Sequence, residues 1–472
     1  MPTASPATGC VFSWGGSEAA RGWRGPSTYG SGPAHVVTTD ELSYTTRTAI
    51  LAHRVAASRN SLALLSDGRV LTWGLNDSRG GGDAWFVRGG RSSSIPDSGQ
   101  LGRWVTMSNR RHASAPGIVT LGPLAAEGAL SIASGRYHAL AIGRISRAVH
   151  SWGLNDHGQL GRSAWVGGRR PRGPPRKPCE SGSRCRDVVA LPVADGPTPA
   201  VAISAGRYFS LAIGANGRAY AWGRCACGQP VASMEGTPLG SGRPYAISGG
   251  GIEQERLVAA ATGYTHLMLL AESGALYTCE SGDDGYGGRL QTAPAPNFYG
   301  QLGRPGPPLT PMRVAPSSLG ASAPSLIAAG RCASFVADAR GEVYAWGCAQ
   351  GSGHRPPDRG TPALLDALRG QTVYALSAGE YHAVAALGAP ATSAGGTAAA
   401  ADARSATPDS SGASEQLRLA VWGAGTGSNY VRVTGLPNKG RVLAVSAGYQ
   451  HNVAILSECD SEGALGVRVE IR

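Results

Sequence analysis

The sequence from residue 132 to residue 162, IASGRYHALAIGRISRAVHSWGLNDHGQLGR, contains two short apolar segments separated by a turn. Small and apolar residues lead to Gly135, which is followed by an aromatic residue, His138 and an apolar run. A second segment ends at Trp152-Gly153, and a polar stretch then closes on Gly-Gln-Leu-Gly at 158–161. Two strands of about five residues cannot bury their faces alone. We therefore expect this unit to be stable only when it is stacked against copies of itself.

A tryptophan followed by glycine recurs along the whole chain, which supports this expectation. The six copies are at Trp14, Trp73, Trp152, Trp222, Trp346 and Trp422. A seventh, degenerate copy is LYTCE at 276–280, where Cys279 stands in the tryptophan's place. We predict a structural role for these tryptophans, because a large ring can fill the wedge between neighbouring sheets. The glycine after each one permits a tight or left-handed turn.

A hairpin precedes the Trp-Gly in each repeat and also occurs seven times. The series of hairpins starts and ends later in the chain than the series of Trp-Gly copies. The copies are at 55–65, 132–142, 203–213, 259–270, 327–336, 376–387 and 445–455. The first Trp-Gly has no hairpin before it, and the last hairpin has no Trp-Gly after it. We predict that the N-terminal strand around Trp14 completes the last sheet and so closes a ring without free edges. The tail at 463–472 is the alternative candidate for that place.

Insertions interrupt the repeats at equivalent points, as expected of a repeat architecture. Residues 78–96 and 281–299 each separate a strand end from its Gly-Gln-Leu-Gly segment. Residues 163–187 form a basic, proline-rich loop, and residues 388–415 form a low-complexity insertion within the sixth hairpin. The Ala, Ser, Gly and Thr of the latter cannot support a core, so we predict that it is disordered. Residues 1–472 are otherwise predicted to form one domain.

The motifs Gly135-x-x-His138, Trp152-Gly153-x-Asn155 and Gly-Gln-Leu-Gly at 158–161 closely resemble the regulator of chromosome condensation repeat. The resemblance covers nearly the whole chain and implies an all-β fold, a seven-bladed β-propeller closed by shared terminal strands. The copies are uneven. Histidine is present only at His138, His266, His382 and His451.

The founding member of that family is a guanine-nucleotide exchange factor for the small GTPase Ran and also docks on nucleosomes. The resemblance therefore implies exchange on a Ran-like small GTPase, which requires tight binding of the nucleotide-free GTPase rather than covalent catalysis. By loop position, acidic candidates for partner binding are Asp77, Asp97, Asp156, Asp283, Asp284 and Glu380, with the four histidines beside them. The alternative is a non-catalytic protein–protein scaffold in a larger, even organellar, assembly.

The chain is basic, with a formal charge of +12, and only Lys177 and Lys439 among its 43 basic residues are lysines. Arginine suits phosphate and carboxylate recognition. Five of the positive charges lie in one loop, at Arg169, Arg170, Arg172, Arg176 and Lys177. They form a candidate nucleic-acid or chromatin contact whose binding would weaken steeply with salt. No aromatic residue is interleaved for base stacking.

Other sites are not expected. The nine cysteines show no framework, which fits a reducing compartment, and neither Cys225/Cys227 nor Cys179/Cys185 has zinc-ligand spacing. Hydrolase and phosphate-loop motifs are missing, so we expect no cofactor, no metal and no hydrolase or oxidoreductase activity. We find neither an apolar run of membrane-spanning length nor a typical targeting segment. Together these features predict an intracellular location, the nucleus or the cytoplasm, with an organelle as the alternative.

Overall fold

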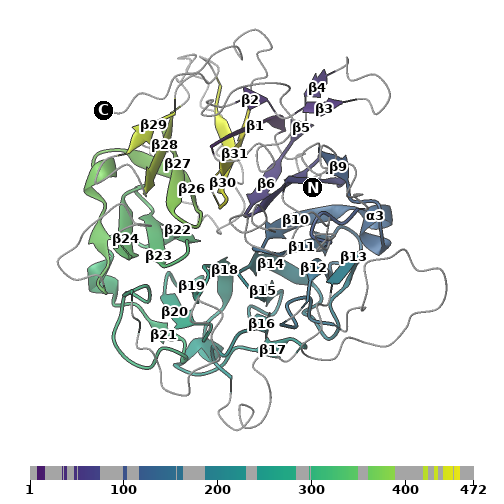
Figure 1. The fold of residues 1–472 in the computed structure, drawn as a ribbon. Coiled ribbons are helices and arrows are strands. Elements are labelled where there is room, and N and C mark those ends of the chain that lie inside the picture. The colour runs from purple at the N-terminus through teal and green to yellow at the C-terminus, as the bar shows by residue number, and fades with distance from the viewer. Residues whose placement is uncertain are drawn as a thin grey trace, which may run out of the picture.

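The computed structural model describes residues 8–15, 34–35, 37–39, 47–49, 51–74, 99–103, 116–155, 157–162, 186–229, 242–282, 297, 299–348, 360–388, 418–423, 430–433, 440–449 and 451–457. Within these residues, one five-stranded sheet and six four-stranded sheets succeed one another around a common axis (Figure 1). A separate two-stranded ribbon is formed by β3 (Val37–Thr39) and β4 (Arg47–Ala49). The predicted seven-bladed β-propeller is confirmed.

Each blade is an antiparallel sheet whose strands follow one another in the chain. The first six blades are β6 (Arg54–Ala57), β7 (Asn60–Leu64), β8 (Val70–Gly74) and β9 (Gly117–Ile118); β10 (Ala129–Ser134), β11 (His138–Gly143), β12 (Val149–Leu154) and β13 (Arg186–Pro192); β14 (Ala200–Ala205), β15 (Phe209–Gly214), β16 (Ala219–Gly223) and β17 (Tyr245–Ala246); β18 (Leu257–Thr262), β19 (His266–Ala271), β20 (Leu276–Glu280) and β21 (Met312–Arg313); β22 (Pro324–Ala329), β23 (Ala333–Asp338), β24 (Val343–Gly347) and β25 (Ala363–Leu364); β26 (Thr372–Ala378), β27 (His382–Gly388), β28 (Leu419–Gly423) and β29 (Val431–Arg432).

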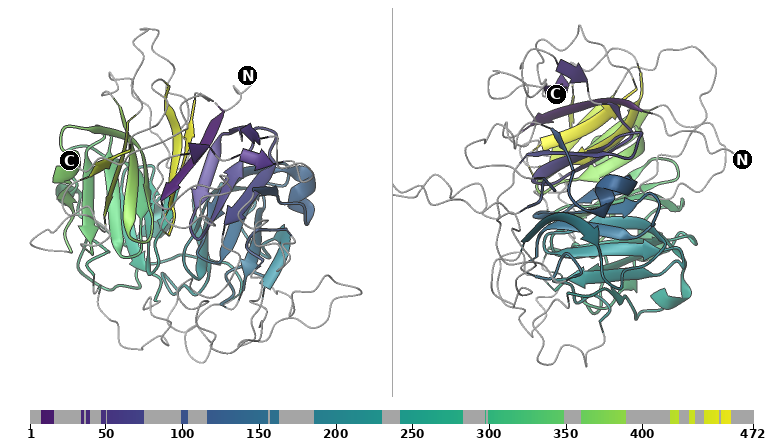
Figure 2. Two further views of the ribbon diagram at one scale, coloured as in Figure 1. Left: turned by 45° about the horizontal axis from the view of Figure 1, so that its top comes forward. Right: turned by 90° about the vertical axis from the view of Figure 1, so that its right-hand side faces the viewer.

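The seventh blade joins the two ends of the described chain, as predicted. β30 (Val442–Ala447) pairs with β31 (His451–Leu456), and β31 pairs with β1 (Gly9–Gly15). β2 (Ala34–His35) and β5 (Leu51–Ala52) also pair with β1. β1 and β31 are in register over six residue pairs, from Cys10 opposite Leu456 to Gly15 opposite His451. In Figure 2 the purple β1 lies beside the yellow C-terminal strands. The alternative tail, residues 463–472, lies outside the described residues.

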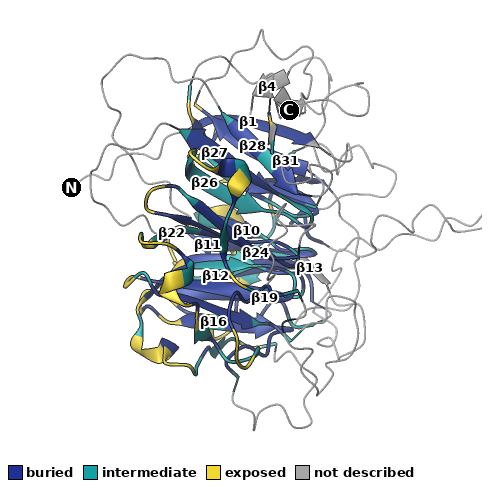
Figure 3. Ribbon diagram, turned by 90° about the vertical axis from the view of Figure 1, so that its left-hand side faces the viewer, coloured by how far each residue is buried: buried dark blue, intermediate teal, exposed yellow. Residues whose placement is uncertain are grey.

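The core lies between the blades, where the second and third strands are buried (Figure 3). The side chains of Trp73, Trp152, Trp222, Trp346 and Trp422 are fully buried, and Trp14 is 7% exposed. The structural role of these six tryptophans stays a prediction. The glycine after Trp152 has φ 112°, and a Cβ there would lie 2.6 Å from the carbonyl oxygen of Tyr137. Only glycine therefore fits at Gly153.

The cysteines form a framework that their spacing did not reveal, so our expectation of scattered thiols is wrong. Disulfides link Cys227 to Cys279 and Cys332 to Cys348, and Cys10 is also disulfide-bonded. Cys225 is a buried free thiol. The reason for the error is geometric: Cys227 and Cys279 belong to neighbouring blades and are 52 residues apart in the chain.

The strands on either side of the low-complexity insertion pair with each other. Residues 389–417 separate β27 from β28, and the register places Ala386 opposite Leu419 across that gap. The insertion therefore leaves from and returns to adjacent strand ends. Most of the 163–187 loop, the segment 78–96 and most of 281–299 lie outside the described residues, as do residues 389–417. The predicted disorder of the low-complexity insertion stays a prediction.

Candidate functional site

The histidines of the repeats bind side chains of the next blade. His138 Nε2 lies 2.8 Å from Ser210 Oγ, and His266 Nε2 lies 2.8 Å from Ser334 Oγ. The other two contacts are His451 Nε2 to Ser61 Oγ at 2.8 Å and His382 Nε2 to Asn452 Oδ1 at 2.9 Å. Three of the four histidines are fully buried, so they are positioned to hold neighbouring blades together rather than to touch a partner.

The serine's other partner determines the tautomer of the histidine. Ser210 Oγ donates to the carbonyl oxygen of Gln159 at 2.8 Å, and Trp222 Nε1 donates to the same oxygen at 2.9 Å. A hydroxyl has one proton, so Ser210 must accept a hydrogen bond from His138 Nε2–H. Burial lowers the pKa of His138 to about 3, so at neutral pH the ring is neutral and carries its proton on Nε2. The same contacts join His266, Ser334, Gln301 and Trp346.

The turn between the first and second strand of each blade brings one residue toward the propeller axis. These inner turns and the segments after the third strands lie at the same end of the blades, because the first residue of each second strand pairs with the end of the third strand, as His138 pairs with Gly153. We call this end the inner-turn face. The residue at the start of each inner turn is Arg59, Arg136, Arg207, Tyr264, Arg331, Glu380 or Tyr449, and together we call these seven residues the axial mouth.

Backbone hydrogen bonds tie the inner turns to one another around the axis. Arg136 N donates to Gly206 O, Glu380 N to Gly448 O, and Tyr449 N to Ser58 O. The preceding glycine is required by this close approach. A Cβ at Gly379 would lie 2.2 Å from the carbonyl oxygen of Gly448. Backbone hydrogen bonds thus join the inner turns at three of the seven junctions of the axial mouth.

Arginine and tyrosine side chains alternate in this mouth. The guanidinium of Arg59 lies 5.3 Å from the ring centre of Tyr137 and 4.8 Å from that of Tyr449. The guanidinium of Arg136 lies 5.4 Å from Tyr137 and 4.9 Å from Tyr264. Arg207 and Arg331 also stack over tyrosine rings. Cation–π contacts of this length stabilise guanidiniums that have left water.

Glu380 is the one acidic residue among the seven residues of the mouth. Its carboxylate is buried, it accepts a hydrogen bond from the Tyr264 hydroxyl, and it lies 3.9 Å from guanidinium nitrogens of both Arg136 and Arg331. Burial raises the pKa of Tyr264 well above its usual range; Arg136 and Arg59 oppose that shift, and Glu380 adds to it. Tyr264 therefore keeps its proton and remains a donor.

The mouth encloses a cavity of about 60 Å³. Its polar lining includes Ser58, Arg136, Tyr264, Glu380 and Tyr449, and small residues of the first strands form the rest. This site can bind charged groups by hydrogen bonding and charge. We see no nucleophile paired with a base among its lining residues, so its geometry supports recognition rather than covalent chemistry.

Comparison with known proteins agrees with this architecture. Residues 200–229 match the regulator of chromosome condensation (RCC1) repeat. The chain superimposes on human WBSCR16 with a TM-score of 0.61 and 18% identity, over 95% of this chain and 98% of that one. It superimposes on Prp20p from Saccharomyces cerevisiae with a TM-score of 0.62 and 17% identity, over 98% and 94%.

The protein is an RCC1-like seven-bladed propeller. In sequence it is also 26% identical over 245 residues to the probable E3 ubiquitin-protein ligase HERC6 of Homo sapiens. That match covers 51% of this chain but only 19% of HERC6, so the chain spans a small part of this curated relative.

Of the acidic residues predicted from the sequence, only Glu380 lies in the described part of this RCC1-like propeller, where it occupies the axial mouth. The other five, Asp77, Asp97, Asp156, Asp283 and Asp284, lie outside the described residues, and so do Arg169, Arg170, Arg172, Arg176 and Lys177 of the basic loop. The sequence interpretation overlooked the arginines of the mouth. Their signal was available: arginine follows the turn glycine at Arg136, Arg207 and Arg331, and Arg59 holds the equivalent position.

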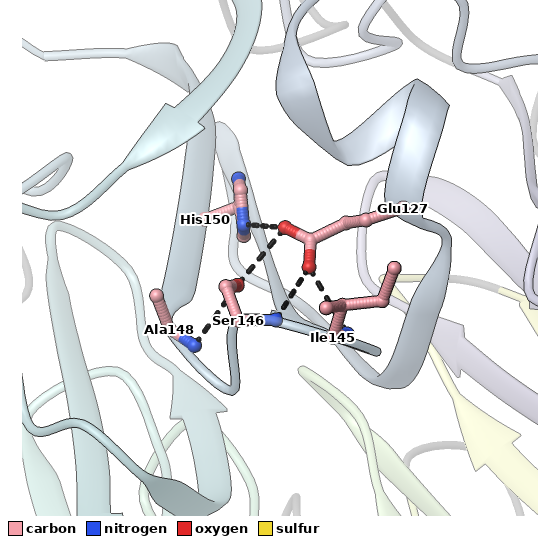
Figure 4. A network of polar contacts seen from close by, with 5 residues as sticks. All are labelled: Glu127, Ile145, Ser146, Ala148 and His150. Carbon is pink, nitrogen blue, oxygen red and sulfur yellow. Dashed lines mark hydrogen bonds and ion pairs between the residues drawn. The ribbon is translucent and has the colours of Figure 1, made fainter.

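The opposite face of the RCC1-like propeller holds a polar network around Glu127, at the end of α3 (Pro123–Glu127) (Figure 4). Glu127 Oε1 lies 2.7 Å from His150 Nε2 and accepts from Ser146 Oγ at 3.0 Å, and Oε2 accepts the backbone amides of Ile145 and Ser146. Burial raises the pKa of Glu127, but the donors from Ser146 and the neighbouring His150 outweigh it, so the net pKa is lowered. In a catalytic triad the serine would contact the histidine, whereas here both Ser146 and His150 contact the Glu127 carboxylate. The network therefore has the geometry of a structural contact.

Two further kinds of site are absent from the described residues. Among them, no group of three or more His, Cys, Asp or Glu side chains could hold a metal ion. No helix in that part of the chain is long and apolar enough to cross a membrane.

Proposed function

We propose that this RCC1-like propeller is a recognition platform that binds another macromolecule through its inner-turn face. One observation carries the proposal: the seven axial positions hold arginine, tyrosine and glutamate, whereas closing the ring requires only small side chains near the axis. Arginine and tyrosine are the residues most enriched at the energetic centres of protein interfaces.

The test compares the two faces of the propeller. Partners captured by the full chain are quantified for wild type, for Arg331→Glu in the mouth and for Ile145→Ser on the opposite face. Arg331 has a side chain that is 26% exposed, and Ile145 is 79% exposed. We expect capture to fall at least about tenfold with Arg331→Glu, because a reversed charge at an interface costs several kcal/mol. Equal capture by Arg331→Glu, or loss only with Ile145→Ser, would assign recognition to another surface.

The most concrete activity is guanine-nucleotide exchange on a Ran-like small GTPase. The support is the fold shared with Prp20p, whose structure was reported with its binding properties to Gsp1p and histones. In this proposal the acidic residues predicted from the sequence, Asp77, Asp97, Asp156, Asp283, Asp284 and Glu380, disturb the nucleotide site of the GTPase. Release of a fluorescent guanine nucleotide from a panel of purified GTPases tests it. Unchanged release across the panel, with partner capture intact, would leave scaffolding as the function.

Contact with nucleic acid or chromatin is the other candidate, and the clustered charges of Arg169, Arg170, Arg172, Arg176 and Lys177 favour it. Five phosphate contacts would give a steep dependence of affinity on salt, with a slope of about −4.5 in a double-logarithmic plot. Changing the four arginines to alanine should flatten that slope and weaken binding to duplex DNA. DNA binding that is equal in the quadruple variant and in wild type would end this proposal.

A further inference from the structure

Arg59 is a buried cation for which the described residues supply no counter-charge. The residue is 2% exposed, and its Nε and Nη1 atoms have no hydrogen-bond acceptor in the described part of the chain. Its guanidinium contacts the faces of Tyr137 and Tyr449 instead. Buried charges in folded proteins are normally paired and hydrogen-bonded, because leaving water is costly.

Arg136 repeats this situation beside it. Both guanidiniums stack on the ring of Tyr137, at 5.3 Å and 5.4 Å, so two positive charges share one aromatic ring. Among the described residues, the one carboxylate paired with Arg136 is Glu380, at 3.9 Å, which is beyond hydrogen-bond distance and is shared with Arg331. Arg136 Nε also lacks an acceptor among the described residues. Its guanidinium N–H groups therefore remain available at the cavity wall.

The cavity has the size of one small oxyanion. Its volume of about 60 Å³ accommodates about four to six water-sized atoms at about 10–15 Å³ each, and a phosphate has four oxygens. Besides Arg136, hydroxyl groups of Ser58, Tyr264 and Tyr449 belong to lining residues. A guanidinium fork matches phosphate geometry.

We propose that the axial mouth binds one phosphate-class oxyanion, held by the guanidinium of Arg136 at the cavity wall. The ion supplies acceptors to the Arg136 N–H groups that lack them, and it offsets the positive charge of Arg59, which stacks on the same tyrosine ring. Glu380 limits the affinity, because its carboxylate stands in the same cavity. The site is measurable on the isolated protein, so it does not depend on the recognition proposal.

Isothermal titration of the full chain with inorganic phosphate at constant ionic strength tests the site, with chloride as the reference salt. A second titration with glycerol 3-phosphate distinguishes a free ion from a phosphate carried by an ester. Saturable binding of either compound with a stoichiometry of one supports the proposal, and the compound that binds more tightly identifies the source. If the heat of binding does not saturate with either compound, the proposal is overturned.

Two variants in the mouth should act in opposite directions. Arg136→Gln should weaken phosphate binding about tenfold or more, because it removes a charged hydrogen-bond donor. Glu380→Gln should strengthen binding severalfold, since it removes the competing negative charge while its amide oxygen still accepts from Tyr264. The matched control is Arg256→Gln, an exposed arginine that lies near Glu272 in the opposite-face turns and should not change binding. Weaker binding in both mouth variants, as a general folding defect would cause, would overturn the proposal. An Arg136→Gln variant that binds phosphate as wild type does would also overturn it.

Discussion

The contact between His138 and Ser210 shows how a single residue position holds two blades together. The serine donates to the Gln159 carbonyl and accepts from the histidine, so each group is satisfied only when both blades are in place. Sequence reasoning identified the histidine from its motif. It could not identify the serine as its partner, because the two are 72 residues apart and belong to different repeats.

Ser210→Ala should therefore destabilise the fold by about 1–3 kcal/mol, because it leaves the buried His138 Nε2–H without an acceptor. Chemical denaturation of the purified chain measures this loss. Ser273→Ala, which removes an exposed hydroxyl that bonds Glu255, is the matched control and should change stability by less than about 0.5 kcal/mol. Equal effects of the two variants would contradict the role assigned to Ser210.

Glu280 stands where other repeats have the glycine after tryptophan, and its carboxyl accepts from Gln301 Nε2 at 2.8 Å. Burial raises the pKa of Glu280 to about 7, against the opposing effect of Arg304. The folded state therefore holds this proton more tightly than the unfolded chain does. The resulting contribution to folding stability is fully present below about pH 4.5 and is lost as the pH rises through about 7.

Glu280→Gln should consequently stabilise the protein by about 1–3 kcal/mol at pH 8 and have little effect at pH 4.5. The measurement is the difference in melting temperature between variant and wild type at the two pH values. Taking the difference cancels the general acid destabilisation expected from buried histidines such as His138, whose lowered pKa costs stability as pH falls below 6.5. A stabilisation that is the same at both pH values would be inconsistent with a titrating Glu280.

Between neighbouring blades, a hydrogen bond from tryptophan is replaced at one interface by a disulfide. Trp152, Trp222 and Trp346 each donate to a glutamine carbonyl of the preceding blade's Gly-Gln-Leu-Gly segment. The blade of β18–β21 has Cys279 in place of tryptophan, and the preceding blade has Cys227 in the segment after β16, where that glutamine segment would begin. The disulfide joins the same two elements that the hydrogen bond joins elsewhere.

Replacing both Cys227 and Cys279 by serine should lower stability by about 2–4 kcal/mol, the usual contribution of a disulfide that closes a long loop. Thermal unfolding of wild type and variant, each with and without reductant, measures it. The variant should lose part of the wild-type response to reductant and keep the part that belongs to Cys332–Cys348. An unchanged melting temperature in the double variant would show that the Cys227–Cys279 disulfide is not needed at this interface.

At the level of the whole molecule, repeat counting was sufficient to predict the number of blades and their closure. The repeats comprise seven hairpins and seven strand ends, and the two series are out of phase. This mismatch predicts that the strand around Trp14 pairs with residues 445–455, with the tail 463–472 as the alternative, and β1 pairs with β31 as predicted. The axial mouth could not be predicted in the same way. Its consecutive residues are 49 to 77 positions apart, and only ring closure brings them to one point, as the ion pair of Arg136 with Glu380 shows.

Closure also determines which parts of the chain can be removed. β1 supplies buried Cys10, Val11 and Phe12 to the seventh blade and covers the edge of β31. Deleting residues 1–15 should expose that edge, lower the melting temperature by at least about 10 °C and promote aggregation. Light scattering during heating measures both effects.

The contrasting deletion is that of residues 389–417, between strand ends already in register. Leu387 N donates to Arg418 O across this gap, so a short glycine-containing turn is enough to connect β27 to β28. We expect that deletion to leave the melting temperature within about 2 °C of wild type, since it removes no residue of a described strand. If instead the N-terminal deletion were tolerated and the 389–417 deletion were not, β1 would not be the element that closes the propeller.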